Sequence, residues 1–103
     1  MIVRSWRGQA RSSNALAYSE HFRRTVLPEL ENITGFLGAS LLRRDGPDSV
    51  EFLVLTRWAS MDAIRAFAGN DVGKAVVEPE ARQALLSFDR TVRHYEVVQD
   101  VSR

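Results

Sequence analysis

The 103-residue sequence has no cysteine, so disulfide frameworks, thiolate nucleophiles and cysteine-based zinc sites are excluded. It has no apolar run long enough to span a membrane, and its first residues lack the apolar core of a signal peptide. We therefore expect a cytoplasmic protein without a membrane partner. Glycine-rich nucleotide motifs and the His-Glu-x-x-His and Gly-x-Ser-x-Gly motifs are also missing, so we expect no nicotinamide, flavin or metal cofactor.

The residues that are present have an ordinary globular composition, 45% hydrophobic and 26% charged, and the length fits a single domain over residues 1–103. Charge is uneven: residues 1–44 carry seven basic and three acidic groups, and residues 45–103 carry seven and ten. The arginines are nevertheless spread over several predicted elements. This spread is typical of a solvated surface, so we expect no nucleic-acid partner.

The periodicity of apolar residues predicts six elements in the order βαββαβ. The predicted strands are 2–9, 36–44, 50–58 and 90–99, and the predicted helices are 15–34, 61–68 and an interrupted stretch over 72–88. Ser12 or Ser13 is expected to cap the first helix, and Ser60 the helix at 61–68. Pro28 is expected to kink or end the first helix, and Pro79 to begin a new turn. This is the order of a ferredoxin-like split βαβ fold, an α+β class with a four-stranded antiparallel sheet.

The two middle strands are apolar on both faces. Because side chains alternate between the two faces of a strand, one face of the strand 50–58 carries Phe52, Val54 and Trp58, and the other carries Leu53 and Leu55. In the strand 36–44, one face carries Phe36 and Leu42, and the other carries Leu37 and Leu41. At ~25 cal/mol per Å² of apolar area, leaving one such face in water would forfeit several kcal/mol. A second copy of the same sheet is the simplest cover, so we expect a homodimer.

Segments along most of the chain resemble the antibiotic biosynthesis monooxygenase domain. They are Trp6-Arg7-Gly8, Pro28 before Gly35-Phe36-Leu37-Gly38, the strand Phe52 to Trp58, the helix Ala63 to Gly69, and His94-Tyr95-Glu96-Val97. The resemblance implies a dimeric α+β barrel in which two ferredoxin-like subunits pack sheet against sheet. It also implies a small-molecule pocket between the sheet and the helices of each subunit.

Family resemblance leaves the activity open among cofactor-independent oxygenation of polyketide quinone precursors, oxidative haem degradation, and isomerisation or binding of small signalling molecules. Haem degraders of this family have an asparagine late in the first strand, a tryptophan in the helix after the third strand, and an axial histidine beyond it. The corresponding positions here are Arg7, Phe67 and Val77. Because valine cannot ligate iron, we expect no haem.

Histidine is the side chain that ordinarily titrates near neutral pH, and the chain has only His21 and His94 as candidate catalytic bases. His94 is preferred because it lies in a predicted strand and in a segment that carries the resemblance. His21 lies three residues after Tyr18 and one residue off the apolar stripe of the first helix, which consists of Ala15, Tyr18, Phe22, Val26, Leu30 and Ile33. Both histidines also have a purely structural interpretation.

Aromatic side chains from several elements are candidates for the walls of a pocket that holds a flat substrate. They are Trp58, Tyr18, Tyr95, Phe67 and Phe88, although core packing explains the same residues. Arg7 and Arg57 are candidates for stabilising an enolate, or for ordinary surface ion pairs.

The leading interpretation is a cofactor-independent monooxygenase acting on a small aromatic or polyketide-like substrate. Deprotonation would give an electron-rich anion that reacts with O2 in a pocket that excludes water. The alternative is a non-catalytic dimeric domain that binds a small molecule or serves as an accessory. An RNA-binding module is disfavoured, because the strand 50–58 lacks the stacking pattern of RNA-recognition motifs.

Overall fold

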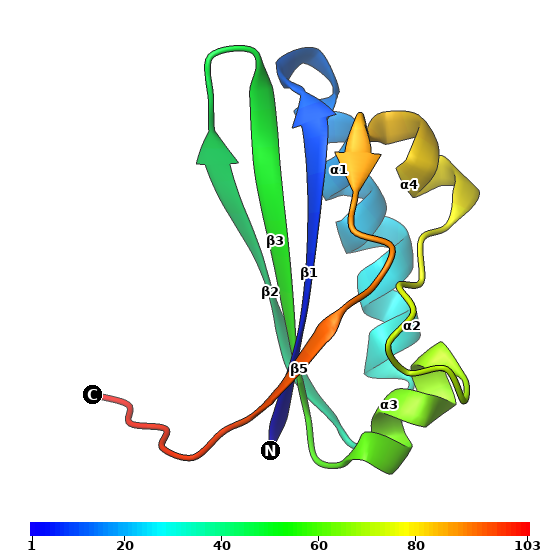
Figure 1. Cartoon of the computed structure of the whole chain (residues 1–103), viewed down its shortest axis with the longest axis vertical. Coiled ribbons are helices and arrows are strands. Elements are labelled where there is room, and N and C mark those ends of the chain that lie inside the picture. Colours follow the sequence, from blue (N-terminus) through cyan, green and yellow to red (C-terminus); the bar gives the residue numbers. More distant parts are fainter.

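The computed structural model describes residues 1–103 as one antiparallel sheet with helices on one face (Figure 1). The strands lie in the order β2-β3-β1-β4, and β5 also pairs with β1. The predicted α+β class and split βαβ order are therefore confirmed. No helix is long and apolar enough to cross a membrane, and the cytoplasmic location stays a prediction.

The three long strands are β1 (Ile2–Arg11), β2 (Phe36–Asp45) and β3 (Ser49–Trp58). The last predicted strand, 90–99, is shorter in the structure, as β5 (Arg93–Glu96), and a further strand, β4 (Ser87–Phe88), lies in the stretch that was expected to be helical. The two strands follow one another along β1. They are separate because residues between them bond to a different segment. The carbonyl of Arg90 accepts from the Ala75 N–H, and the Val92 N–H donates to Gly73.

The first helical segment consists of α1 (Ala15–His21), one π-helical turn (Phe22–Val26) and α2 (Leu27–Glu31). Pro28 lies in the first turn of α2 and has no N–H to donate, so the wider turn before it relieves the helix. The predicted apolar stripe is confirmed, since Tyr18, Phe22 and Leu30 are buried. The predicted serine cap is wrong, because the chain enters α1 through a 3-10 turn at Ser12–Asn14 with no side-chain cap.

The second crossover begins as predicted with α3 (Met61–Ala68), where the Ser60 hydroxyl accepts from the Ala63 N–H. The expected helical stretch over 72–88 is largely wrong. A turn at residues 72–73 is followed by a single bridge from Lys74 to Thr91 and by irregular backbone to residue 78, and only α4 (Pro79–Ala84) is helical. Backbone bonds from residues 73–75 to residues 90–92 replace the helical bonds, while Pro79 begins α4 as expected.

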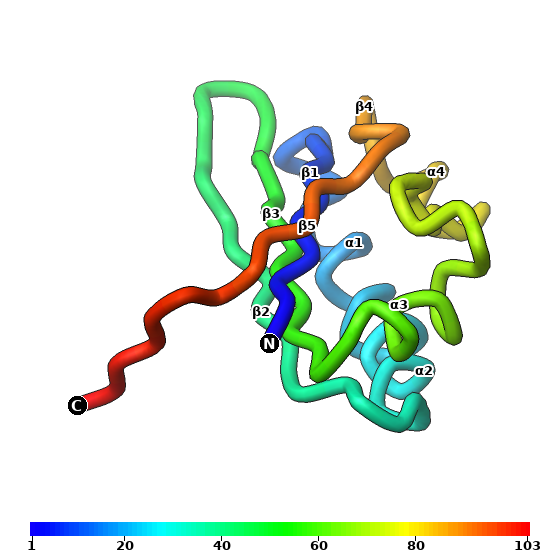
Figure 2. Tube along the Cα trace, turned by 60° about the horizontal axis from the view of Figure 1, so that its bottom comes forward, coloured from blue at the N-terminus to red at the C-terminus, as the bar shows by residue number.

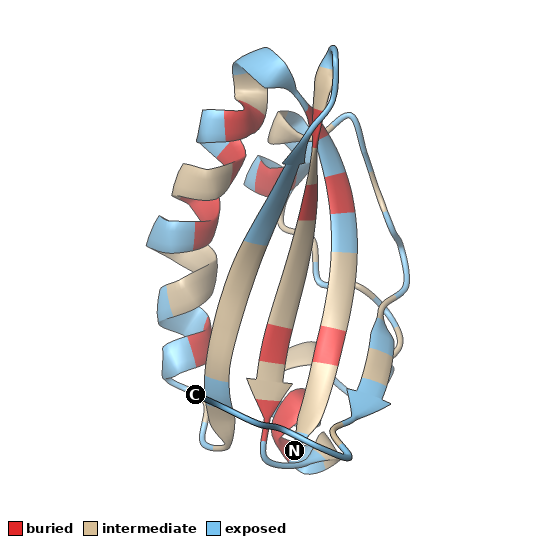
Figure 3. Cartoon of the chain, turned by 90° about the vertical axis from the view of Figure 1, so that its left-hand side faces the viewer, coloured by how far each residue is buried: buried red, intermediate tan, exposed pale blue.

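A bulge at Leu37 corrects the predicted faces of β2. The register shifts between Phe36 and Gly38, so Phe36 opposes Trp58 and Leu41 opposes Val54, both on the helix-covered face. Strict alternation had separated Phe36 from Leu41. The open face still carries apolar side chains, including Leu42 opposite Leu53, and Figure 3 shows this side of the sheet as mostly intermediate or exposed.

The buried core is split into two clusters along the sheet. One lies around Tyr18, Phe52 and Val50 near β4 and α4, and the other lies around Trp58, Leu30 and Ile64 near α3. Figure 2 shows the helices on one side of the sheet, with the segment after α3 running between α3 and α4. This division leaves room for a cavity between the two clusters.

Candidate functional site

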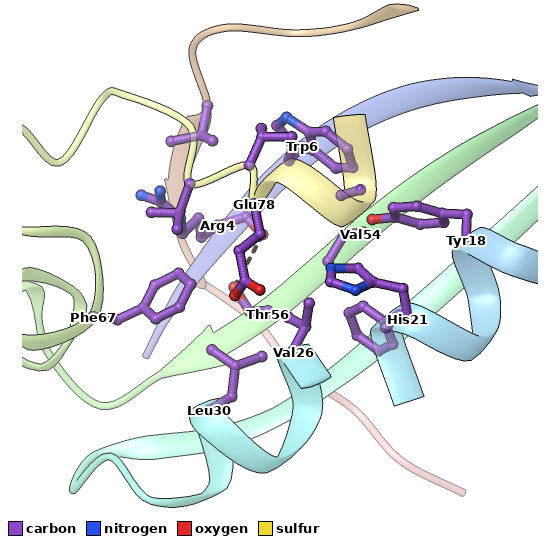
Figure 4. A pocket seen from close by; sticks show the side chains of 15 residues that line it. Arg4, Trp6, Tyr18, His21, Val26, Leu30, Val54, Thr56, Phe67 and Glu78 are labelled. Carbon is purple, nitrogen blue, oxygen red and sulfur yellow. Dashed lines mark hydrogen bonds between the residues drawn. The ribbon is translucent and has the colours of Figure 1, made fainter. Parts of the chain in front are cut away.

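A cavity lies between the sheet and the helices and takes its walls from both core clusters (Figure 4). Eleven of its fifteen lining residues are hydrophobic, and its mouth is open to solvent. The lining comes from β1, β3, the first helical segment, α3, the segment after α3, α4, and Val92 just before β5. A mainly apolar cleft with a few polar groups is the usual form of a small-molecule site.

His21 is the polar group on the helical wall of the cavity, and its side chain is 1% exposed. Neither ring nitrogen has a hydrogen-bond partner. Nδ1 lies 3.1 Å from Oε2 of Glu80, a carboxylate that is 70% exposed, but their relative orientation is not that of a hydrogen bond. The contact therefore brings a ring nitrogen close to a solvent-exposed carboxylate without a hydrogen bond between them.

Glu78 is the acidic residue of the cavity lining, and its side chain points into the cavity in Figure 4. Its pKa is raised first by burial, then by a hydrogen bond to the Glu29 carboxyl and by the charges of Glu29 and Glu80, while His21 acts in the opposite direction. A hydrogen bond between two carboxyl groups requires a proton on one of them, which favours the neutral form of Glu78. The site therefore holds a second proton carrier near His21.

Arg4 enters from β1 and is 5% exposed. Its Nη1 donates to the Val72 carbonyl (2.6 Å) and to Nε2 of His94 (3.0 Å), and its Nη2 donates to the Lys74 carbonyl (3.1 Å). Since a guanidinium cannot accept, His94 accepts through Nε2 and is neutral in this contact. Burial first and the charge of Arg4 second lower the pKa of His94.

Aromatic and hydroxyl groups complete the walls. Burial raises the pKa of the Tyr18 phenol, which therefore stays a neutral O–H group. Trp58 lies behind Thr56 and donates through Nε1 to its hydroxyl (2.8 Å). Its indole also stacks on Phe67 with 5.8 Å between ring centroids. Trp58 thus supports two lining residues from the fully buried core without reaching the cavity itself.

The structure brings together some of the residues singled out from the sequence and separates others. Those that line the cavity are His21, Tyr18 and Phe67. His94 and Trp58 lie one contact behind the wall, against Arg4 and Thr56. Tyr95 and Arg7 lie elsewhere: they oppose Val3 and Leu53 in the register, on the open face of the sheet, and Tyr95 is 52% exposed. Arg57 lies on that open face as well and donates to Ser40.

Three chemically important lining residues were missed from the sequence: Arg4, Trp6 and Glu78. Alternation along β1 was a usable signal for the first two, because Arg4 and Trp6 share the helix-covered face with buried Ala10. No comparable signal existed for Glu78. Its segment was expected to be helical, and only the extended backbone there turns its side chain inward.

Comparison with known proteins adds the family to this geometry. The family model described as antibiotic biosynthesis monooxygenase matches residues 1–79. The chain belongs to the antibiotic biosynthesis monooxygenase family. Among curated proteins, none matches this chain in sequence.

Several solved structures share the fold of this chain over nearly their whole length. SnoaB from Streptomyces nogalater, a cofactor-independent oxygenase, is 22% identical with a TM-score of 0.63, and the match covers 99% of this chain and 98% of that chain. A heme-degrading protein from Mycobacterium tuberculosis is 27% identical with a TM-score of 0.62, covering 100% and 98%. A protein of unknown function from Nitrosomonas europaea is 16% identical with a TM-score of 0.65, covering 99% and 93%.

The cavity does not fit the haem-degrading pattern that the resemblance implies. Val77 lines the cavity where that pattern has an axial histidine, and it offers no ligand atom. Phe67 lines it where the pattern has tryptophan, and Arg7 lies outside it altogether. The family supports a monooxygenase-type function on a small molecule, and the residues of this cavity do not favour haem as that molecule.

Proposed function

We propose that the protein is a cofactor-independent monooxygenase that oxidises a small, flat, enolisable aromatic or polyketide-like molecule in this cavity. The observation that carries the proposal is the buried imidazole of His21, whose two nitrogens lie without hydrogen-bond partners in a mainly apolar cavity. Burying an unpaired polar group costs folding free energy, so its presence points to a use in binding or catalysis.

His21 acts as the general base in this mechanism. It removes a proton from an activated CH2 group of the substrate and leaves an electron-rich carbanion or enolate. That anion transfers an electron to O2, and recombination forms a carbon–oxygen bond to a hydroperoxide. Loss of water from the hydroperoxide breaks the O–O bond and leaves a carbonyl, so one oxygen atom of O2 enters the product and the other becomes water.

The remaining polar groups fit defined tasks in this scheme. Glu78, whose pKa is raised by burial and by its hydrogen bond to Glu29, returns a proton to the departing oxygen. The neutral Tyr18 phenol and the apolar walls limit the access of water to the anion. His94 keeps Nε2 engaged with Arg4, so we assign it a positioning role in place of the role of base expected from the sequence.

The experiment is oxygen consumption with a panel of anthrones and hydroquinones on chelator-treated protein, with the product's new oxygen traced from labelled O2. We expect one labelled atom per product, and His21→Gln to lower the rate by about 10²- to 10⁴-fold. Ser19→Ala on the same helix, outside the cavity, serves as the matched control. Saturable binding of these molecules without turnover would replace the proposal with the non-catalytic binding domain.

We also propose a homodimer that covers the open face of the sheet. Leu42 and Tyr95 on that face are 44% and 52% exposed, and Leu53 and Leu55 are only half-buried. The chain after β5 leaves toward the same side in Figure 1, with Val98 and Val101 about nine-tenths exposed. Apolar area of this extent favours association between copies.

Light scattering on a sizing column tests the dimer. We expect twice the chain mass for the wild type and a monomer for Leu42→Glu, since a charge at the centre of an apolar interface is strongly unfavourable. Leu16→Glu, at a 69% exposed leucine on the helical side, is the control that keeps the dimer. A wild-type monomer at micromolar concentration would overturn this proposal.

A further inference from the structure

Arg4 is a buried cation that no acidic side chain neutralises. None of the ion pairs in the chain involves it. Its three hydrogen-bond acceptors, the carbonyls of Val72 and Lys74 and the imidazole of His94, are all uncharged. Burial lowers the pKa of Arg4 to about 10, which leaves it positive at neutral pH. A net positive charge therefore lies at the wall of a mainly apolar cavity.

Such a charge is uncommon, because a buried guanidinium is normally paired with a carboxylate or a phosphate. The side chain has five N–H donors, and the three hydrogen bonds described above leave two of them without a partner in the protein. The Phe67 ring faces the guanidinium with 5.9 Å from Cζ to the ring centroid. This cation–π contact orients the group and leaves its charge uncompensated.

Glu78, the acidic residue of the cavity lining, does not supply a negative charge that neutralises Arg4. Its carboxyl group responds to Glu29, Glu80 and His21, and its raised pKa favours the neutral form, the opposite of what a partnership with Arg4 would produce. In Figure 4, Arg4 and His21 approach the cavity from opposite sides. A ligand between them would meet a cation at one end and a proton acceptor at the other.

We propose that Arg4 is an anion-binding residue, and that the cavity takes a flat, mainly apolar ligand as an anion with one delocalised oxyanion group on the guanidinium. Carboxylate, enolate and phenolate oxygens share this chemistry, and the planar fork of N–H donors suits them. The proposal deepens the proposed function by naming its substrate class, an acidic aromatic molecule. In turnover, Arg4 stabilises the negative charge that forms when His21 removes the proton.

Equilibrium binding of two non-oxidisable probes to the wild-type protein tests this inference. The probes are 2-naphthoate and 2-naphthamide, which share the ring system and differ in charge. We expect the acid to bind about 10- to 100-fold more tightly than the amide. Arg4→Met should remove this preference while keeping affinity for the amide, and Arg11→Met, an exposed arginine of the same strand, should retain it.

Because Arg4 also holds the Val72 and Lys74 backbone, Arg4→Met has a structural risk, and a second measurement on the wild type covers it. The side-chain Nε–H resonance of Arg4, assigned by ¹⁵N spectroscopy, should shift on addition of 2-naphthoate and stay in place with 2-naphthamide. Equal affinities for the two probes, no measurable binding of the acid, or an unmoved Arg4 resonance would each overturn the inference. A preference for the acid without oxygen consumption supports the anion site and counts against the oxygenase alone.

Discussion

Replacing His21 by leucine should make the protein more stable and inactive at the same time. A buried polar group without a partner costs about 1–3 kcal/mol, and both ring nitrogens of His21 are in that state. The variant also loses the contact between His21 and Glu80. The Glu80 side chain is 70% exposed, so this contact contributes about 0–1 kcal/mol. Leucine is apolar and similar in size, so the net gain is about 1 kcal/mol.

A gain of this size is measurable in a domain of this length. It corresponds to an increase of about 4–8 °C in Tm and a matching shift of the urea midpoint at unchanged slope. Oxygen consumption should fall by about 10²- to 10⁴-fold in the same sample, as expected when a positioned base is lost. The combination distinguishes a catalytic histidine from one retained for packing.

The same substitution at the other histidine provides the contrast. His94→Leu removes the acceptor of an Arg4 N–H, so we expect it to lower stability by about 1–3 kcal/mol. The reasoning about His21 would be refuted if His21→Leu lost more than ~1 kcal/mol of stability, because an unpaired polar group cannot produce that loss on removal. Full oxygenase activity in the variant would refute it equally.

Three further predictions concern pH, packing and haem. Burial and the Arg4 charge lower the pKa of His94 from 6.5, so the unfolded chain binds a proton at a higher pH than the folded protein does. The free energy of unfolding should therefore fall as the pH drops below 6.5 toward the folded pKa. Urea melts of His94→Gln should show a smaller fall. An added Cβ at Gly8 would lie 2.8 Å from the Trp6 ring, so Gly8→Ala should lose about 1–3 kcal/mol in urea melts and weaken 2-naphthoate binding. Haemin titration should give no histidine-ligated Soret band, because Val77 supplies no ligand. A stoichiometric histidine-ligated spectrum would contradict this prediction.

Local sequence patterns determined most of the fold. Spacing of Tyr18, Phe22 and Leu30 was sufficient to define the buried side of the first helical segment, and Ser60 marked the start of α3. The two apolar faces of β3 also followed from its residues alone. These features depend on side-chain period and on capping, which are properties of a short stretch of chain.

The tertiary structure decided the features that depend on distant partners. The bulge at Leu37 moved Phe36 and Leu41 to one face, and backbone bonds between residues 73–75 and 90–92 replaced an expected helix. Pairing of β5 with β1 placed His94 against Arg4, where its nitrogen is occupied. His21 gained its place in the cavity because the segment before α4 folds across it. A sequence records which groups are present, whereas the free charge of Arg4 and the unpaired nitrogens of His21 depend on contacts that form only when the strands and helices pack.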